Sequence, residues 1–208
     1  MRTNRLVLAS SSPRRRELLG AAGFRFVIEP SFIEELVAIG EDPWLATVRL
    51  AVEKAEAVAE RADARDVVLA ADTAVVIDDR IVLGKPASRA EAVEMLLSLS
   101  GRNHTVLTAW AILRGRGSGA HTTRAASGVG VLQGGLSRSV VRMREIARRE
   151  AEAYADTGEP MDKAGAYAAQ GEGRRFIGAI VGPLDNVIGL PMTPVGPALA
   201  RAGIVPRT

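Results

Sequence analysis

A serine- and arginine-rich stretch near the start of the chain has the residue types of an anion site. Apolar residues 6–8 lead to serines at 10–12, Pro13 and arginines at 14–16. Ser12 can cap a helix and Pro13 suits its first position, so free backbone N–H groups and the positive end of the helix dipole face the serines. Because guanidinium groups bind phosphate oxygens through paired donors, the stretch predicts a polyphosphate cradle. An ordinary solvated helix start is the alternative.

Lysine is rare in this chain and stands at isolated positions. Only three of the 27 basic residues are lysines, namely Lys54, Lys85 and Lys163. A lysine offers a compact, rotatable charge that an arginine cannot reproduce in a tight site. We therefore take all three as candidates for a charged site, with chance retention as the alternative.

Carboxylates that could work with these cations occur at 34, 35, 72 and 162. Carboxylates can hold a divalent cation that bridges phosphate oxygens, and one of them can orient or deprotonate an attacking water. This inventory suits hydrolysis of a phosphoanhydride. Asp72 is the best candidate for the base, because we expect it at the end of a buried strand, where sites in α/β sheets tend to form. A turn-capping aspartate is the alternative.

Length and composition bound the class of protein that carries these residues. The 208 residues can bury a substantial core, and 47% hydrophobic content with 4% aromatics fits an α/β protein packed with small aliphatic side chains. With no cysteine and two histidines, a metal site would use carboxylates, which favours Mg²⁺ or Mn²⁺. No apolar stretch suits a membrane span or a signal peptide, so we expect a soluble cytoplasmic protein without a membrane partner.

Hydrophobic patterning predicts the elements that position these residues. The expected strands cover residues 5–8, 24–28, 66–71, 74–77, 81–83, 105–113, about 121–132 and 176–181. The expected helices cover 13–22, a segment from 43, a segment from 89, roughly 144–156, and a last helix from 193. Asp42 is expected to cap the second of these helices, which has a buried stripe of Leu45, Val48, Val52, Ala55 and Ala59, and a Ser88 capping box opens the third. Residues 158–171 are mostly polar or small, which predicts a shaped loop that lines a site.

Two other functional classes fit the pattern less well. Residues 84–86 lack the earlier glycine and the following hydroxyl of a P-loop, which argues against a P-loop NTPase. Arginines between 138 and 149 could bind nucleic acid, but the glutamates among them favour a solvated helix face. We expect no stable nucleic-acid partner.

Taken together, these motifs resemble the Maf family of nucleoside triphosphate pyrophosphatases, known also as septum-formation inhibitors. The resemblance extends over nearly the whole chain and includes all three lysines. It rests on residues 8–10, 12–15, 51–55, 71–73, 83–86, 99–101, 158–160, 162–171 and 189–191. It implies one domain over residues 1–208, an elongated mixed α/β sheet of the Maf/ITPase-like kind flanked by helices, two lobes around a deep cleft, a homodimer and a divalent cation, Mg²⁺ or Mn²⁺.

The resemblance also implies a role for each matched site residue. Asp72 would be the general base and would hold the metal with Glu35, while Lys54 and Lys85 complete the catalytic set. Substrate would be bound by Ser10, Ser12, Arg14, Arg15, Thr73, Asp162, Lys163 and Gln170. In the family, glutamine at position 170 with Thr73 accompanies action on dTTP and UTP, whereas glutamate accompanies 7-methyl-GTP. A glutamine amide can pair with a pyrimidine edge through its donor and its acceptor.

The implied activity is hydrolysis of dTTP or UTP between the α and β phosphates, with modified pyrimidine nucleotides as further substrates. Such an enzyme removes unwanted nucleotides from the pool and is linked to cell-division arrest. The alternatives are a 7-methyl-GTP-type pyrophosphatase of the same family and a non-catalytic nucleotide-binding regulator of septum formation.

Three segments depart from the family pattern. Glycines interrupt the strand expected in residues 128–142, the turn at 78–80 lacks a glycine, and Asp185 and Asn186 replace a more aromatic stretch. The first departure puts the strand limits and the dimer edge in question.

Overall fold

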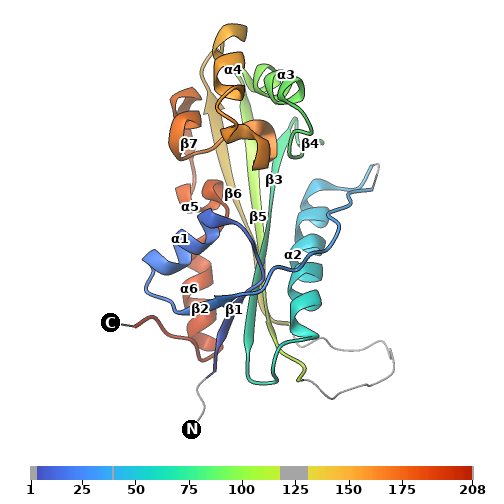
Figure 1. The fold of residues 1–208 in the computed structure, drawn as a ribbon, viewed down its shortest axis with the longest axis vertical. Helices are drawn as coiled ribbons and strands as arrows, with labels where there is room; N and C mark the ends of the chain where they lie inside the picture. Colours follow the sequence, from blue (N-terminus) through green and yellow to red (C-terminus); the bar gives the residue numbers. More distant parts are fainter. Residues whose placement is uncertain (1–3, 39, 118–130, 208) are drawn as a thin grey trace.

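A long mixed β-sheet forms the spine of the molecule (Figure 1). The computed structural model describes residues 4–38, 40–117 and 131–207. Within these residues seven strands run in the order β2-β1-β3-β5-β6-β7, with β4 paired to β3. β1 is parallel to β2 and β3, and the other pairs are antiparallel. The strands are β1 (Leu6–Leu8), β2 (Phe26–Ile28), β3 (Val67–Ile77), β4 (Ile81–Leu83), β5 (Asn103–Arg114), β6 (Val131–Met143) and β7 (Ile177–Val181).

Helices cover both faces of this sheet. They are α1 (Pro13–Ala21), α2 (Pro43–Ala59), α3 (Arg89–Leu99), α4 (Arg148–Ala155), α5 (Leu184–Ile188) and α6 (Met192–Arg201). Three 3₁₀ turns, Glu159–Asp162, Ala164–Ala166 and Gly171–Phe176, follow α4. None of the helices in the described ranges has the length and apolarity needed to cross a membrane.

The hydrophobic core divides into an upper and a lower part, which give the molecule two lobes (Figure 1). In the lower lobe, α2 packs on one face of the sheet and α1 and α6 on the other. In the upper lobe, α3 and α4 pack with the turns after α4 around Phe176 and Tyr154. β3 and β5 supply side chains to both parts, so the sheet is elongated, as the family resemblance implies.

Three helices begin where their capping residues predict. The Ser12 hydroxyl accepts the N–H of the third helical residue of α1, whose first residue is Pro13. Asp42 accepts two N–H groups at the start of α2, and Ser88 accepts that of Glu91 in α3. These predictions are confirmed because a cap depends on neighbours in sequence alone. α4 begins at Arg148, later than the expected residue 144, since the backbone N–H of residue 144 bonds to Phe176 beside β7.

The buried stripe predicted for α2 is wrong in part. Leu45 and Val48 are 68% and 40% exposed. Ala55 and Ala59 are buried as predicted, and with Ala51 they form a buried row at a spacing of four residues. Small side chains let the helix approach the sheet closely, and the larger side chains of the first turns point to solvent.

The strand limits predicted around Asp72 are also wrong, because β3 does not end there. β5 pairs with β3 continuously from Val67 to Val76. On the opposite edge of β3, β1 pairs with residues 67–69 and β4 with residues 75–77. Residues 70–74 therefore have no strand partner on that edge, and we call this gap the notch. Asp72 and Thr73 lie in the notch.

The glycines of β6 have a packing reason rather than marking a break in the strand. β6 runs without interruption through Gly134 and Gly135, and Gly135 stands opposite Trp110 of β5. A Cβ atom at Gly135 would lie 2.8 Å from the Trp110 ring. The strand expected at about 121–132 falls mostly outside the described residues. α5 was not expected at all, since five residues are too short for a periodic pattern.

Candidate active site

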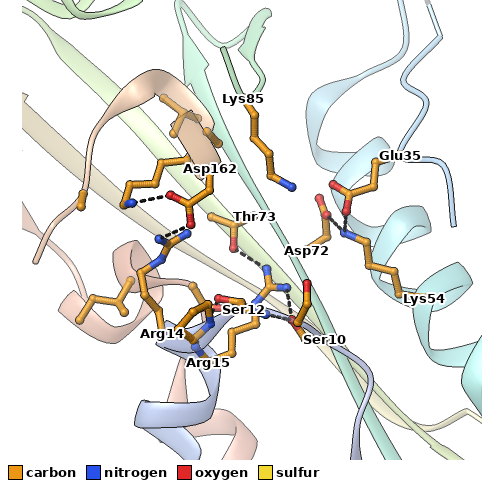
Figure 2. A pocket seen from close by; sticks show the side chains of 18 of the residues that line it. Ser10, Ser12, Arg14, Arg15, Glu35, Lys54, Asp72, Thr73, Lys85 and Asp162 are labelled. Atoms are coloured by element: carbon orange, nitrogen blue, oxygen red, sulfur yellow. Dashed lines mark hydrogen bonds and ion pairs between the residues drawn. The ribbon is translucent and has the colours of Figure 1, made fainter. Parts of the chain in front are cut away.

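One pocket gathers all twelve residues to which the family resemblance assigns a role. Figure 2 labels ten of them. It has a volume of about 350 Å³ and opens at the notch. Its walls come from the loop before α1, the loop before α2, Lys85 after β4, the turns after α4 and the end of α5. These segments are far apart in sequence, so the pocket exists only in the folded chain.

Lys54 bridges two carboxylates on the α2 side of the pocket (Figure 2). Its Nζ lies 2.5 Å from Asp72 Oδ1 and 2.9 Å from Glu35 Oε1. Lys54 and Asp72 are 5% and 6% exposed, whereas Glu35 is half exposed. Lys54 therefore faces the pocket rather than solvent.

Glu35 lies in a field of cations. Burial alone would raise the pKa of its carboxyl group, but Lys54, Lys85 and Arg15 lower it, and the net pKa is below the usual value. Glu35 is therefore an anion over a wide range of pH. The exposed Lys85 extends from the end of β4 toward the same space (Figure 2).

An ion pair joins the start of α1 to the turns after α4 across the pocket. Arg14 Nη1 lies 3.4 Å from Asp162 Oδ2, and Lys163 Nζ lies 2.5 Å from Oδ1 of the same carboxylate. Burial opposes ionisation of Asp162, yet the two cations hold its pKa below the ordinary value. The 158–171 segment lines the pocket, as predicted, and Gln170 belongs to the same wall.

Arg16 does not belong to the cradle that the sequence predicted from three arginines. Arg16 is exposed and is not among the residues that line the pocket. Successive residues of an α-helix are about 100° apart, so three in a row cannot all face one ligand. Arg14 and Arg15 face the pocket, and Arg16 faces solvent.

Arg15 is fixed by three hydrogen bonds, of which Figure 2 shows those to Ser10 and Thr73. Its Nε donates to the carbonyl oxygen of Gly189 at 2.9 Å, and its two Nη atoms donate to the hydroxyls of Ser10 and Thr73, each at 3.2 Å. Burial lowers its pKa from the usual value, but arginine stays protonated in proteins. Free guanidinium N–H groups remain for a ligand, since these three bonds use only part of the five donors.

The donor set of the pocket fits a divalent cation held together with a ligand. Glu35 and Asp72 lie close together, since both contact Lys54 Nζ, and no group of three or more metal-binding side chains occurs among the described residues. Mg²⁺ is usually bound through one or two carboxylates plus substrate phosphates rather than by a closed protein cage. Lys54 balances the two negative charges.

Contributors that the sequence analysis missed lie behind the pocket. Thr108 of β5 hydrogen-bonds to Thr73, its register partner on β3, and to the backbone of Asn186 in α5. Farther up β5, the buried His104 ring lies 2.7 Å from the hydroxyl of Tyr167, which lines the pocket, and burial lowers the pKa of His104 to about 4. Only strand register could have indicated the Thr73–Thr108 pair.

This fold and site define an α/β protein whose cleft sets two carboxylates and a lysine opposite the cationic start of a helix. The model of the family described as Maf-like protein matches residues 5–202, and the chain belongs to this family. The resemblance drawn from the sequence motifs is thereby confirmed.

Two relatives cover almost the whole chain. A dTTP/UTP pyrophosphatase from Anaeromyxobacter dehalogenans (strain 2CP-C) is 44% identical over 199 residues, which are 96% of this chain and 94% of that protein. A dTTP/UTP pyrophosphatase from Moorella thermoacetica is 45% identical over 202 residues, 97% of this chain and 96% of that protein. A solved HAM1 protein from Coxiella burnetii aligns with 70% of this chain and 74% of its own at 16% identity and a TM-score of 0.42, and so distant a likeness carries no argument.

Proposed function

We propose that this protein hydrolyses dTTP and UTP to the nucleoside monophosphate and pyrophosphate. One observation carries the proposal: the Lys54-bridged carboxylates Asp72 and Glu35 share a pocket with Arg14 and Arg15. A water-activating group and an anion cradle are the two parts that phosphoanhydride hydrolysis needs. The names of both relatives agree with this activity.

Each side of the pocket would perform one part of the reaction. On one side, Arg14, Arg15 and the N–H groups at the start of α1 bind phosphate oxygens, with Ser10 and Ser12 shaping that loop. On the other side, Asp72 orients the attacking water and accepts its proton. Asp162 and Lys163 close the wall across from α1.

Positive charges in the pocket would neutralise the phosphates of the substrate and the carboxylates that activate water. A divalent cation, Mg²⁺ or Mn²⁺, held by Glu35 and Asp72 would neutralise phosphate oxygens and make the phosphorus easier to attack. Lys85 extends toward the same space and stabilises the charge that develops on the leaving pyrophosphate. Lys54 keeps the two carboxylates together by its contacts with both.

Thr73 and Gln170 support a pyrimidine substrate. Both residues line the pocket, so one bound nucleotide can reach both of them. A glutamine amide presents a donor and an acceptor side by side, which matches the edge of a uracil or thymine ring.

Chromatography of reaction products tests the proposal directly. The purified protein is incubated with Mg²⁺ or Mn²⁺ and, separately, UTP, dTTP, 7-methyl-GTP and ATP. Monophosphate and pyrophosphate from UTP and dTTP support it, whereas selective cleavage of 7-methyl-GTP overturns the substrate and keeps the enzyme class. No turnover of any triphosphate would favour the nucleotide-binding regulator.

We further propose that residues 1–208 act as one domain, in a homodimer, in the cytoplasm. The continuous strands β3 and β5, which enter the core of both lobes, support one domain. Light scattering after size-exclusion chromatography tests the dimer, and a single unfolding transition followed by fluorescence and by circular dichroism tests the single domain.

A further inference from the structure

A closed ring of hydrogen bonds surrounds the Arg15 guanidinium. One path runs directly from Arg15 Nε to the carbonyl oxygen of Gly189. The other runs from Arg15 Nη2 to the Thr73 hydroxyl at 3.2 Å, on to the Thr108 hydroxyl at 3.0 Å, and on to the carbonyl oxygen of Asn186 at 2.9 Å. Asn186 lies in α5 and Gly189 caps it, so both paths end on one short helix.

The protons in this ring have only one possible arrangement. A carbonyl oxygen can only accept, so the Thr108 hydroxyl donates its proton to Asn186. Thr108 then accepts from the Thr73 hydroxyl, which leaves a Thr73 lone pair to accept from Arg15, a group that can only donate. Each hydroxyl is thus used once as a donor and once as an acceptor.

The far side of the ring is sealed from water. Thr108 and Asn186 are both 0% exposed. The Asn186 amide donates to the carbonyl oxygen of Val106 at 3.1 Å and to the Ser139 hydroxyl at 3.0 Å, which fixes α5 against β5 and β6. A hydroxyl lost from this place could not be replaced by a solvent molecule without moving the packing.

Gly189 adopts a backbone conformation that favours glycine at the point where the ring closes. Its φ is +123°, which strains any residue with a side chain, and a Cβ atom there would make ordinary contacts of 3.4 Å with Thr73 Oγ1 and 3.7 Å with Arg15 Nε. The ring therefore depends on the backbone at this position as well as on side chains.

We propose that Thr108 and Asn186 are positioning residues, which orient the Arg15 guanidinium toward the phosphates through Thr73 without touching the substrate. The orientation itself is a property of the ligand-free protein. Only the consequence for catalysis rests on the proposed function, in which Arg15 binds a nucleotide phosphate.

The orientation can be tested without any substrate, by NMR of arginine Nε–H groups. The Arg15 Nε–H signal is identified as the one that is missing from the spectrum of Arg15→Lys. The wild type and Thr108→Ser are expected to show a slowly exchanging Arg15 Nε–H, and the isosteric Thr108→Val to show exchange at least about tenfold faster. Thr108→Ala replaces the valine variant if that variant does not fold.

Thr47→Val is the matched control, because Thr47 is 1% exposed and its hydroxyl bonds to the Pro43 carbonyl within α2, outside the ring. If the Arg15 Nε–H still exchanges slowly in both Thr108→Val and Thr108→Ala, the proposal is overturned. It is also overturned if Thr47→Val speeds the exchange as much as the Thr108 variants do.

Kinetics then test the consequence for catalysis. With UTP and Mg²⁺, Thr108→Val is expected to lower kcat/KM about tenfold, mostly through KM, and Thr108→Ser to change it less than about twofold. In an Arg15→Ala background the valine substitution should have no further effect. An equal loss of kcat/KM in both backgrounds would overturn the positioning role of Thr108. If the wild type cleaves no triphosphate, the proposed function fails, and the NMR comparison still decides the positioning role.

Discussion

Asp72 and Thr73 are neighbours in sequence, yet their side chains lie on opposite faces of the sheet. Asp72 contacts Lys54 of α2, whereas Thr73 contacts Arg15 of α1. Side chains alternate along any strand, and here the notch lets one pocket reach both faces. The acid–base group and the anion cradle can therefore be held by different helices and still meet at one ligand.

Replacing Asp72 by asparagine should abolish turnover and keep the fold. The amide cannot accept the proton of a water, so we expect kcat with UTP and Mg²⁺ to fall at least about 10²-fold. Asp66→Asn is the control, since Asp66 is also buried but pairs with Arg5 outside the pocket. It should lower stability and leave kcat within about twofold. Full activity in Asp72→Asn would exclude it as the base.

Lys54 and Lys85 should differ in their effect on stability. Lys54→Met leaves Asp72 and Glu35 without their shared cation, so we expect the free energy of unfolding to fall by about 3 kcal/mol. Lys85 is exposed, and Lys85→Met should change that free energy by less than about 0.5 kcal/mol. Urea denaturation followed by circular dichroism measures both, and product analysis should show reduced turnover in each. Equal stability of the two variants would contradict the buried ion pair.

Glu35 should control the requirement for metal. Glu35→Gln removes one carboxylate, so the Mg²⁺ concentration for half-maximal activity should rise about tenfold. Glu34→Gln is the matched control, because the neighbouring glutamate is exposed and lies outside the pocket lining. A metal titration of initial rates distinguishes them, and identical curves would remove Glu35 from the metal site.

Gln170 should influence the choice of base. Gln170→Glu replaces an amide donor by an acceptor, so the ratio of kcat/KM for UTP to that for 7-methyl-GTP should fall at least about tenfold. Gln133→Glu serves as the control, since Gln133 bonds to Arg201 away from the pocket. An unchanged ratio would place base recognition elsewhere.

His104 should make stability depend on pH in a defined window. The folded protein holds its pKa at about 4, below the usual 6.5 of an unfolded chain. Between these values the unfolded chain binds a proton that the folded protein does not, so stability falls as the pH is lowered from about 6.5 to about 4 and levels off below that. The total is about 3 kcal/mol. Urea midpoints at several pH values should show this slope in the wild type and less of it in His104→Gln.

The sequence predicted what depends on local order. Caps at Ser12, Asp42 and Ser88 form from residues two or three positions apart, and each was found where expected. The rarity of lysine also pointed to the pocket, which is lined by Lys54, Lys85 and Lys163.

Features that depend on distant contacts escaped the sequence analysis. The end of β3 was misplaced because continuous pairing with β5, not its own residues, carries the strand past Asp72. The pairing of Thr73 with Thr108 depends on the register between two strands. The acceptor for Arg15 Nε at Gly189 is a backbone carbonyl oxygen, so no residue type in the sequence could indicate it.

Two of the groups that hold the arginines of α1 lie late in the chain. Arg14 bonds to a residue 148 positions later, and Arg15 to one 174 positions later. At a synthesis rate of about 5–20 residues per second, α1 waits roughly 10–35 s for that acceptor. A growing chain can therefore form the α2–β3 ion pair well before the phosphate cradle, and it acquires a complete active site only when α5 has emerged from the ribosome and folded.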